Sequence, residues 1–578
     1  MGKIITIDPI TRIEGHLKID IEVSGGKITN AWSSGTMYRG IEQILVGRDP
    51  REAWLFTQRF CGVCTTVHAI ASVRAVENAL DLEIPVNAQL IRNLIMASHG
   101  IFDHIVHFYH LSALDWVDVV SATKAKAKDA ANFAQLISPT WHRNTTAEMQ
   151  ATKDRVIAVV KSGQLGIFNN GYWGHKAMEL PPHINLMAVA HYLQALEYQR
   201  KINEVTGLLG GKTPHIQNLA VGGVANAIDL DEQTSLNMTT LLKVKSYFDE
   251  IKDFVNNVYL TDVCAVGTAY VGETAYGKGV ANYLAVPEFP IDGKGTDFSK
   301  GILGGTVIKG KVKGITSYQD KYFEDNVSES IARSYYDGDW NRHPYQESTD
   351  PKVSDYDRNG KYSWCKAPRF QGKPMQVGPL ANILSSFMLG DKRVAKYATI
   401  ALGKINAFGK ALGISTAAKL DVNGLVGALQ SSLGRHAARA VRAAVMTDMA
   451  LDHWALLVDN ISKGDKEIFN KPVFPKGEQQ GFGYHEAPRG TLSHWIVIKD
   501  GKIKNFQAVV PSTWNAGPRD EKDQKGPYEA SLIGNKIRDE KRPLEALRVI
   551  HSFDPCLACA VHAFDPEGNE LGTANTSI

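Results

Sequence analysis

Near its N-terminus the chain reads RFCGVCTTVH at residues 59–68, and near its C-terminus it reads DPCLACAVH at residues 554–562. Each stretch holds a Cys-x-x-Cys pair followed by a histidine, and the chain has only two other cysteines, Cys264 and Cys365. Two residues between thiolates let both sulfurs converge on one point, so four such sulfurs can form a soft site for a transition metal. If they do, the two ends of the chain must meet, and we expect one large interwoven body rather than a string of independent domains.

The cysteine pairs alone are compatible with a redox dithiol, a structural zinc site or a catalytic metal site. A single pair could be a redox dithiol, but no short βαβ unit surrounds the first one. Zinc ribbons usually place about 15–20 residues between their pairs, whereas Cys64 and Cys556 are 492 positions apart. A chain of 578 residues also builds its own core and has little need of a metal staple. Structural zinc and a catalytic metal both stay open at this point.

The composition is that of an ordinary globular protein, with 44% hydrophobic and 22% charged residues. The net charge of +3 is small for this length, so we expect no nucleic-acid partner. No apolar run is long enough to cross a bilayer. The N-terminus does not resemble a signal peptide because polar and acidic residues appear by Asp8. Any export would therefore need an export signal carried by another chain.

Alternation of apolar and polar residues predicts two β-hairpins, one towards each end of the chain. The first has arms at 17–23 and 27–29, and the second has arms at 495–498 and 503–510. Glu14 lies just before or within the first arm of the first hairpin. Before the second hairpin stands EAPRG at 486–490, a tight loop that could aim Arg489 inward. A surface salt bridge is the alternative interpretation of that arginine.

Helical periodicity predicts long helices over four stretches, 49–79, 87–114, 187–209 and 379–461. On the second of these, His99, Asp103 and His107 share one face at i, i+4 and i+8. Di-iron bundles use paired Glu-x-x-His motifs, which the chain lacks, so we favour polar residues buried beside a cofactor or an interface.

These patterns together predict an α+β fold that is predominantly α-helical. We expect a central bundle of long helices with small β-hairpin or sheet regions at the N- and C-terminal parts. The stretch from about 272 to 360 is rich in Gly, Lys, Asp and Tyr and has short β-like runs. We interpret it as a peripheral insertion.

With these segments assembled, the chain resembles the large subunit of a nickel–iron hydrogenase, of the membrane-associated respiratory uptake type. The resemblance covers essentially the whole chain and rests on the blocks 8–16, 39–49, 59–68, 163–174, 210–223, 486–490, 509–515 and 551–562. It implies the nickel-dependent hydrogenase large-subunit fold, as a single interwoven domain over 1–562 with a C-terminal maturation peptide over 563–578. The alternative is a zinc-bearing or metal-free structural subunit of a respiratory oxidoreductase complex. The related quinone-reductase subunit of such complexes, however, lacks both cysteine pairs.

The resemblance implies that Cys61, Cys64, Cys556 and Cys559 bind nickel. Two of them, Cys64 and Cys559, would also bridge to an iron that carries carbon monoxide and cyanide. Soft thiolates suit nickel, and shared thiolates bring a second metal close to it. Position 556 is cysteine, so the chain is not the selenocysteine variant.

The surroundings of this centre are also implied by the resemblance. Arg489 and Ser512 would lie beside the cyanide ligands, with Pro488 and Pro511 lining the pocket. Guanidinium and hydroxyl donors suit such anionic nitrogen acceptors. His68 would be the partner of a bridging sulfur and would tune its basicity.

The implied reaction is the reversible, heterolytic oxidation of H2 to protons and electrons. Two bases are open for the proton, the thiolate of Cys556 and the side chain of Arg489. Because a free guanidinium is effectively always protonated, the second base needs a strongly perturbed site. By resemblance, Glu14 would take the proton from Cys556 as a relay, and Asp103 and Asp554 would orient Arg489.

A magnesium site is implied by the resemblance alone. Its ligands would be Glu42, the backbone carbonyl of Ala508, and His562. Magnesium prefers oxygen, so the histidine is an unusual ligand.

Further chains are expected because Cys264 and Cys365 cannot bind an iron–sulfur cluster, which generally needs four ligands. The resemblance implies an iron–sulfur small subunit with a twin-arginine signal, in a heterodimer or a dimer of heterodimers. It also implies a membrane electron-transfer subunit, a quinone or cytochrome acceptor, and the periplasmic face of the cell membrane. A maturation endopeptidase would cleave after His562, so the chain as given is interpreted as the unprocessed precursor.

Overall fold

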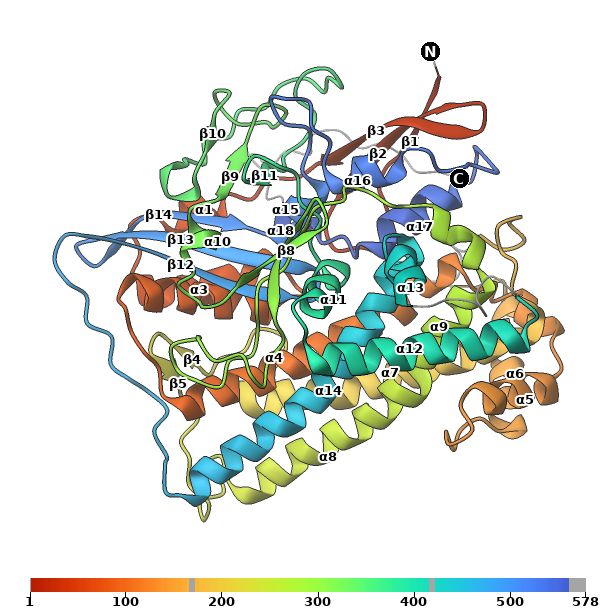
Figure 1. The fold of residues 1–578 in the computed structure, drawn as a ribbon, viewed down its shortest axis with the longest axis horizontal. Helices are drawn as coiled ribbons and strands as arrows, with labels where there is room; N and C mark the ends of the chain where they lie inside the picture. The colour runs from red at the N-terminus through yellow and green to blue at the C-terminus, as the bar shows by residue number, and fades with distance from the viewer. Residues whose placement is uncertain (1, 166–171, 415–421, 561–578) are drawn as a thin grey trace.

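The computed structural model describes residues 2–165, 172–414 and 422–560, with the side chains of 422–425 and 559–560 excluded. In these parts of the chain, long helices gather on one side of the molecule and small antiparallel sheets lie on the other (Figure 1). This arrangement confirms the predicted α+β fold, which is predominantly helical with small sheets. None of the described helices is both long and apolar enough to span a membrane.

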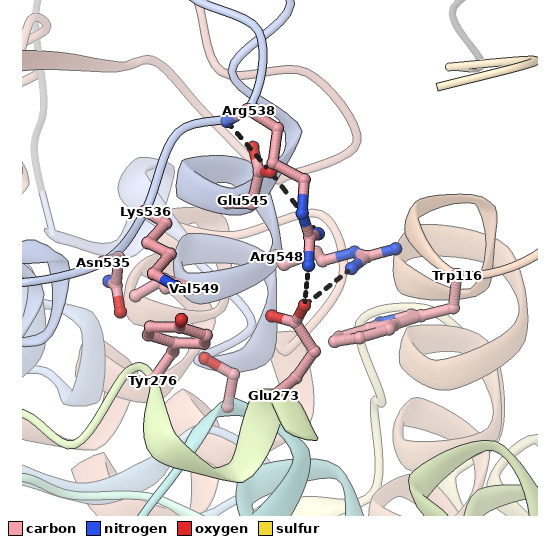
Figure 2. A pocket seen from close by; sticks show the side chains of 10 residues that line it. Trp116, Glu273, Tyr276, Asn535, Lys536, Arg538, Glu545, Arg548 and Val549 are labelled. Carbon is pink, nitrogen blue, oxygen red and sulfur yellow. Dashed lines mark hydrogen bonds and ion pairs between the residues drawn. The ribbon is translucent and has the colours of Figure 1, made fainter. Parts of the chain in front are cut away.

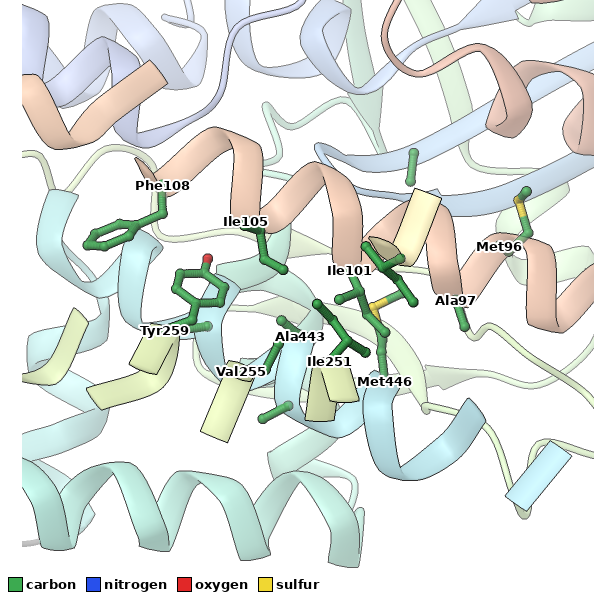
Figure 3. Packing of buried hydrophobic residues seen from close by; sticks show 14 of the residues in the cluster. Met96, Ala97, Ile101, Ile105, Phe108, Ile251, Val255, Tyr259, Ala443 and Met446 are labelled. Atoms are coloured by element: carbon green, nitrogen blue, oxygen red, sulfur yellow. The ribbon is translucent and has the colours of Figure 1, made fainter. Parts of the chain in front are cut away.

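The bundle is built from the longest helices of the chain. They are α4 (Val86–Val106), α7 (Pro182–Gly210), α8 (Met238–Phe254), α12 (Lys392–Ala411) and α14 (Ser432–Ser462). Ala97, Ile101 and Ile105 of α4 recur every four residues and face the neighbouring helices (Figure 3). A Cβ at Gly100 would lie 2.4 Å from Met446 Cε, so the methionine side chain of α14 packs directly against this glycine. Each buried isoleucine contributes about 1.5–3 kcal/mol, so this face is sufficient to hold α4 in the core.

Two three-stranded antiparallel sheets correspond to the predicted hairpins, and each gains one strand. The N-terminal sheet orders β1 (Lys3–Ile7), β2 (Leu17–Ser24) and β3 (Lys27–Gly35). The C-terminal sheet orders β12 (Glu478–Ala487), β13 (Gly490–Lys499) and β14 (Lys502–Val509). Both hairpins were predicted correctly, because period-two alternation is a local property of each strand.

Helix α3 (Thr65–Ala79) lies against β12, and glycines make the close contact possible (Figure 1). A Cβ on Gly481 would lie 2.3 Å from the nitrogen of Ala79, and a Cβ on Gly483 would lie 2.2 Å from the oxygen of Ala71. This antiparallel course directs the N-terminal end of α3 towards the β12–β13 turn. The first cysteine pair stands at that end of the helix.

The stretch 272–360, expected to be peripheral, is partly buried. Its strands join two small sheets. One is ordered β6 (Tyr283–Leu284), β7 (Gly304–Ile308), β8 (Lys311–Ile315), and the other β10 (Asn341–Arg342), β9 (Val327–Ser330), β11 (Ala367–Phe370). Leu284, Val286, Phe323 and Val327 pack in one apolar cluster with Trp495 of the C-terminal sheet. The composition, rich in Gly, Lys, Asp and Tyr, suggested a peripheral insertion because the apolar residues of this cluster are widely spaced in the sequence.

Shorter elements connect these layers. The helices are α1 (Ile41–Leu45), α2 (Ala53–Thr57), α5 (Ala127–Ile137), α6 (Thr146–Ser162), α9 (Leu260–Ala269), α10 (Lys321–Glu324), α11 (Pro379–Met388), α13 (Val422–Leu429), α15 (Pro511–Ala516), α16 (Pro527–Leu532), α17 (Leu544–Ser552) and α18 (Leu557–Ala560). The strands are β4 (Leu219–Ala220), β5 (Gly223–Val224), β6 (Tyr283–Leu284), β7 (Gly304–Ile308), β8 (Lys311–Ile315), β9 (Val327–Ser330), β10 (Asn341–Arg342) and β11 (Ala367–Phe370).

Candidate metal centre

Three cysteine thiols from opposite ends of the chain meet in the interior. Cys556 Sγ lies 3.3 Å from Cys61 Sγ and 3.7 Å from Cys64 Sγ. The three sulfurs lie within 4.8 Å of one another, and each residue is at most 5% exposed. A buried, convergent set of soft donors fits a transition metal. The side chain of Cys559, the fourth predicted ligand, lies outside the described residues.

The first cysteine pair is shaped by backbone N–H groups. The amides of Val63 and Cys64 each donate to Cys61 Sγ at 3.1 Å. Cys64 is itself the N-cap of α3, where the positive end of the helix dipole favours a thiolate. These contacts favour the deprotonated form that metal ligation requires.

The two chain ends are joined by a short parallel bridge between Glu14 and Cys556. The amide of Glu14 donates to the carbonyl of Pro555 at 3.3 Å, and the amide of Leu557 donates to the carbonyl of Glu14 at 2.6 Å. Burial and the negative charge of Cys61 raise the pKa of the Glu14 carboxyl above its usual value. The half-buried glutamate therefore lies beside the thiols and is more easily protonated than a surface glutamate.

A glycine and an arginine make this junction possible. Gly15 has φ +81°, and a Cβ there would lie 2.1 Å from the nitrogen of Ala558, so no larger residue fits. Arg39 donates to the carbonyl of Phe60 and, at 2.9 Å, to the carbonyl of Ala558. One guanidinium thus holds the residues that precede Cys61 and Cys559. Sequence reasoning placed Arg39 in a family block but assigned it no role.

Arg489 points inward and meets two carboxylates, which excludes the surface interpretation. Its Nη1 lies 2.8 Å from Asp103 Oδ2, and its Nη2 lies 2.9 Å from Asp554 Oδ1. All three side chains are at most 3% exposed. Burial alone would lower the pKa of Arg489, but the two carboxylates and the nearby thiols raise it well above its ordinary value. The guanidinium is therefore charged, while burial raises the pKa of Asp554 to about 7.

The predicted lining residues share one small pocket with the thiols. It is lined by Cys64, Val67, His68, Ala487, Pro488, Arg489, Leu492, Val510, Pro511, Ser512 and Cys556. The hydroxyl oxygen of Ser512 accepts the amide proton of Cys556 at 3.0 Å, which leaves the hydroxyl proton available to another acceptor. Most predicted site residues are thus brought together around the thiols.

A histidine that sequence reasoning missed supports His68. Nδ1 of His68 lies 3.1 Å from Nε2 of His494, and both rings are fully buried. Burial lowers the pKa of His68 to about 4 and lowers that of His494 well below its usual value. The two rings are therefore neutral, and one of them donates its N–H to the unprotonated nitrogen of the other. Only the register of β13 against α3 brings them together, so no local pattern could have revealed the pair.

A buried acidic cluster surrounds the predicted magnesium ligands that the structure describes. Glu42 Oε1 accepts the amide of Ala508 at 2.9 Å. Nζ of Lys366 lies 3.7 Å from Glu42, 3.5 Å from Glu329 and 2.9 Å from Glu347. Three carboxyl groups thus face one ammonium, and burial raises the pKa of Glu329 well above its usual value and also raises that of Glu347. A divalent cation would favour their ionised forms. Sequence reasoning missed Lys366, Glu329 and Glu347; His562 lies outside the described residues.

Another pocket lies around α17, the helix that leads to Asp554 (Figure 2). Nη2 of Arg538 lies 3.2 Å and Nη1 of Arg548 lies 3.8 Å from Glu273 Oε1. Arg548 also donates to the carbonyls of Asp115 at 2.9 Å and Ala177 at 2.8 Å. These contacts anchor α17 and therefore fix the start of the Asp554–Cys556 segment.

Comparison with known proteins identifies the family. A family model described as nickel-dependent hydrogenase matches residues 39–562, and one described as HoxL-like matches residues 4–32. The chain belongs to the nickel-dependent hydrogenase family. The predicted resemblance is confirmed, and the thiol cluster and its arginine lie within the matched range.

Relatives of this hydrogenase extend over nearly its full length. It is 50% identical to the Hydrogenase-2 large chain of Escherichia coli (strain K12), over 99% of each chain. It is 42% identical to the uptake hydrogenase large subunit of Rhodobacter capsulatus, over 99% of this chain and 97% of that one.

Solved structures of hydrogenases share the fold. The reduced Ni-Fe-Se hydrogenase from Desulfovibrio vulgaris Hildenborough is 31% identical, with a TM-score of 0.75, over 97% of this chain and 100% of that one. The reduced, active Ni-Fe-Se hydrogenase from Desulfomicrobium baculatum is also 31% identical, with a TM-score of 0.74 and the same coverage. The selenium in those names belongs to those proteins, because position 556 here is cysteine.

These matches decide between the two functions that the sequence left open. The chain is the large subunit of a nickel–iron uptake hydrogenase, an oxidoreductase that oxidises H2. The alternative of a zinc-bearing or metal-free structural subunit is set aside. The thiol cluster fits the nickel–iron centre that the family name implies.

Proposed function

We propose that Cys61, Cys64, Cys556 and Cys559 hold nickel, and that Cys64 and Cys559 also bridge to an iron carrying carbon monoxide and cyanide. The observation that carries this proposal is the convergence of three buried thiols from opposite chain ends within 4.8 Å. Backbone amides on Cys61 Sγ add support, because they stabilise a thiolate. When bound, the centre supplies the site at which H2 is split heterolytically and from which electrons depart.

The proton would leave through Cys556 and Glu14. Arg489 is the weaker candidate for the base, because its ion pairs with two carboxylates keep it charged. Glu14 is bridged to Cys556 through the backbone, and its raised pKa brings it nearer to the operating pH, where a relay is most effective. In this proposal Cys556 accepts the proton and Glu14 passes it towards the surface.

The remaining pocket residues would orient the centre and exclude water. Arg489, with Asp103 and Asp554 holding it, and the hydroxyl of Ser512 would donate to the cyanide ligands. Pro488 and Pro511 would line the pocket without adding competing donors. His68 would act on a bridging sulfur, with its tautomer set by the paired His494.

A magnesium ion would be held by Glu42, the carbonyl of Ala508 and His562. The gathering of the carboxyl groups of Glu42, Glu329 and Glu347 around Lys366 supports this assignment, because carboxylate oxygens are ligands that magnesium prefers. A divalent cation would stabilise the ionised forms of these carboxyl groups, whose pKa values burial raises in Glu329 and Glu347.

The electrons would pass to an iron–sulfur small subunit, in a heterodimer or a dimer of heterodimers. Among the described residues, Cys264 and Cys365 lie in two separate groups of packed apolar side chains, so they do not form a binding site for an iron–sulfur cluster. A membrane subunit would carry the electrons to a quinone or cytochrome at the periplasmic face, after export with the small subunit. A maturation endopeptidase would cleave after His562 and remove 563–578 from the single domain over 1–562.

Metal analysis of the co-purified complex tests the centre. We expect about one nickel per large subunit and one iron beyond the content of the small subunit, with infrared bands from diatomic ligands on that iron. Zinc in place of nickel would contradict the proposal.

A further inference from the structure

A second arginine lies behind the turn that carries Arg489. Arg442 of α14 pairs with Glu288, and both residues are fully buried. Nη2 of Arg442 lies 2.8 Å from Oε1 and 2.9 Å from Oε2 of Glu288, and its Nε lies 3.2 Å from Oε1. Neither residue belongs to the sequence-predicted site.

The remaining donors of Arg442 reach the backbone of the turn. Nη2 donates to the carbonyl of Glu486 at 2.6 Å, and Nη1 donates to the carbonyl of Ala487 at 2.9 Å. These residues immediately precede Pro488 and Arg489. One guanidinium therefore holds two successive carbonyls at the point where β12 enters the turn.

The turn is short, so its entry determines where Arg489 lies. Ala487 pairs with Gly490, which leaves only Pro488 and Arg489 between the strands. Gly490 has φ +123°, and a Cβ there would lie 2.4 Å from the nitrogen of Gly378, so the far side of the turn is also closely packed. Because only two residues connect the strands, a shift of the Ala487 carbonyl would move the Arg489 backbone.

Arg489 and Arg442 both contact the same part of α4. Asp103 accepts a hydrogen bond from Nη1 of Arg489 at 2.8 Å. Nε2 of His104, the next residue, lies 3.4 Å from Nη1 of Arg442. Helix α4 thus contacts both the guanidinium of Arg489 and Arg442, which holds the backbone just before Arg489.

We propose that Arg442, oriented by Glu288, is a positioning residue that holds the Pro488–Arg489 turn over the thiols. The inference rests on the proposed role of Arg489. A misplacement of about 1 Å can lower a rate by about 100-fold, so a residue with no contact to the pocket can still affect turnover.

Arginine is required for this role because its planar fork can bind a carboxylate and two carbonyls at once. Lysine at the same position has a single nitrogen and cannot reach all three acceptors. Arg442→Lys therefore keeps the buried charge and removes the bridge.

The chain offers a matched control in Arg92. It pairs with Glu77 at 2.7 and 3.0 Å and donates to the carbonyls of Ala220 and Gly223, each at 2.9 Å. Arg92 is equally buried but touches no residue of the Arg489 turn. Arg92→Lys should affect stability as Arg442→Lys does, without affecting Arg489.

The experiment compares the two lysine variants in the intact complex by thermal midpoint, nickel content, kcat and KM for H2, infrared bands of the iron ligands, and crystal structure. We expect similar thermal midpoints and nickel content. Only Arg442→Lys should lower kcat, by about tenfold or more, with KM nearly unchanged. It should also shift the infrared bands and lengthen the Arg489–Asp103 contact. Glu288→Gln keeps an acceptor and should have a smaller effect.

Equal kcat and infrared bands in the two lysine variants, or an unmoved Arg489 in the Arg442→Lys crystal, would overturn the proposal. If Arg442→Lys does not fold, the double variant Arg442→Met/Glu288→Met removes both charges and leaves no buried ion unpaired. Arg489→Lys separates the two proposals. Normal kcat in that variant would refute the proposed role of Arg489, while the crystal position of the turn would still test Arg442.

Discussion

Cys61 Sγ and Cys556 Sγ lie 3.3 Å apart, although 495 positions separate the two residues along the chain. The contact requires the N-terminal segment to run directly beside the C-terminal cysteine motif. Glu14 bridges to Cys556 there, and Gly15 leaves room for the backbone of Ala558. The metal centre is therefore a product of chain closure, and the predictions for Cys556 and Glu14 depend on it.

Cys556→Ser should abolish H2 oxidation and lower the nickel content of the complex. A serine hydroxyl is a hard, weakly acidic ligand that cannot replace a soft thiolate. Activity and nickel are measured on the co-purified complex. Cys264→Ser is the matched control, since that thiol is also buried but contacts the carbonyl of Ala401 and is not one of the three convergent thiols. Equal nickel content in the two variants would contradict the ligand assignment.

Glu14→Gln should slow proton exchange with solvent by about 100-fold while nickel and iron remain bound. The amide keeps the shape of the side chain but cannot carry a proton. Exchange of D2 with water, followed by mass spectrometry, measures this step directly. The exposed Glu52→Gln serves as the control. Normal exchange in Glu14→Gln would rule out the relay.

Arg489→Met should destabilise the subunit by about 3–5 kcal/mol, because it removes the guanidinium that both buried carboxyl groups, Asp103 and Asp554, contact. Adding Asp103→Asn and Asp554→Asn should restore most of that stability and none of the activity. Chemical denaturation and H2 oxidation assays on the complex separate the two effects. A triple variant as unstable as Arg489→Met would show that the ion pairs are not the cause.

Glu42→Gln should release magnesium and leave nickel in place. The substitution removes one of the carboxylates that face Lys366, so the site loses the negative charge that favours a divalent cation. Elemental analysis of the purified complex gives both metals from one sample. Unchanged magnesium would place the ion elsewhere.

Acid should destabilise the protein from about pH 6.5 downward, because several buried histidines stay neutral in the folded state. Burial lowers the pKa of His453 to about 4, whereas in the unfolded chain it is near 6.5. Between these values the unfolded state binds more protons, so the free energy of unfolding falls as the pH falls. The slope is on the order of 1 kcal/mol per pH unit for each such histidine.

His453→Gln should therefore flatten the pH dependence of stability between about pH 6.5 and 4. Thermal or urea midpoints of the complex across this range provide the measurement. His142→Gln, at an exposed position, is the control. A slope unchanged from the wild type in His453→Gln would exclude its contribution.

The sequence predicted the helices and hairpins well where the signal is local. The helix expected over 187–209 exists, but it begins earlier, at Pro182, because proline is favoured in the first turn. The helix expected over 87–114 is α-helical to Val106 and then continues as a π-helical segment, His107–Ser112. There His107 stacks on His436 of α14, with ring centroids 5.5 Å apart, a contact that helical periodicity does not contain.

By itself, the sequence determined which donors exist and which segments form strands or helices, because ligand chemistry and backbone periodicity are local properties. Only the tertiary structure decided which buried charges meet. Arg489 pairs with Asp103, which is 386 positions away in the sequence, and Arg442 pairs with Glu288, which is 154 positions away. A buried charge is stabilised by an opposite charge or by hydrogen-bond partners, and which groups meet depends on how helices and strands pack, which no local pattern encodes.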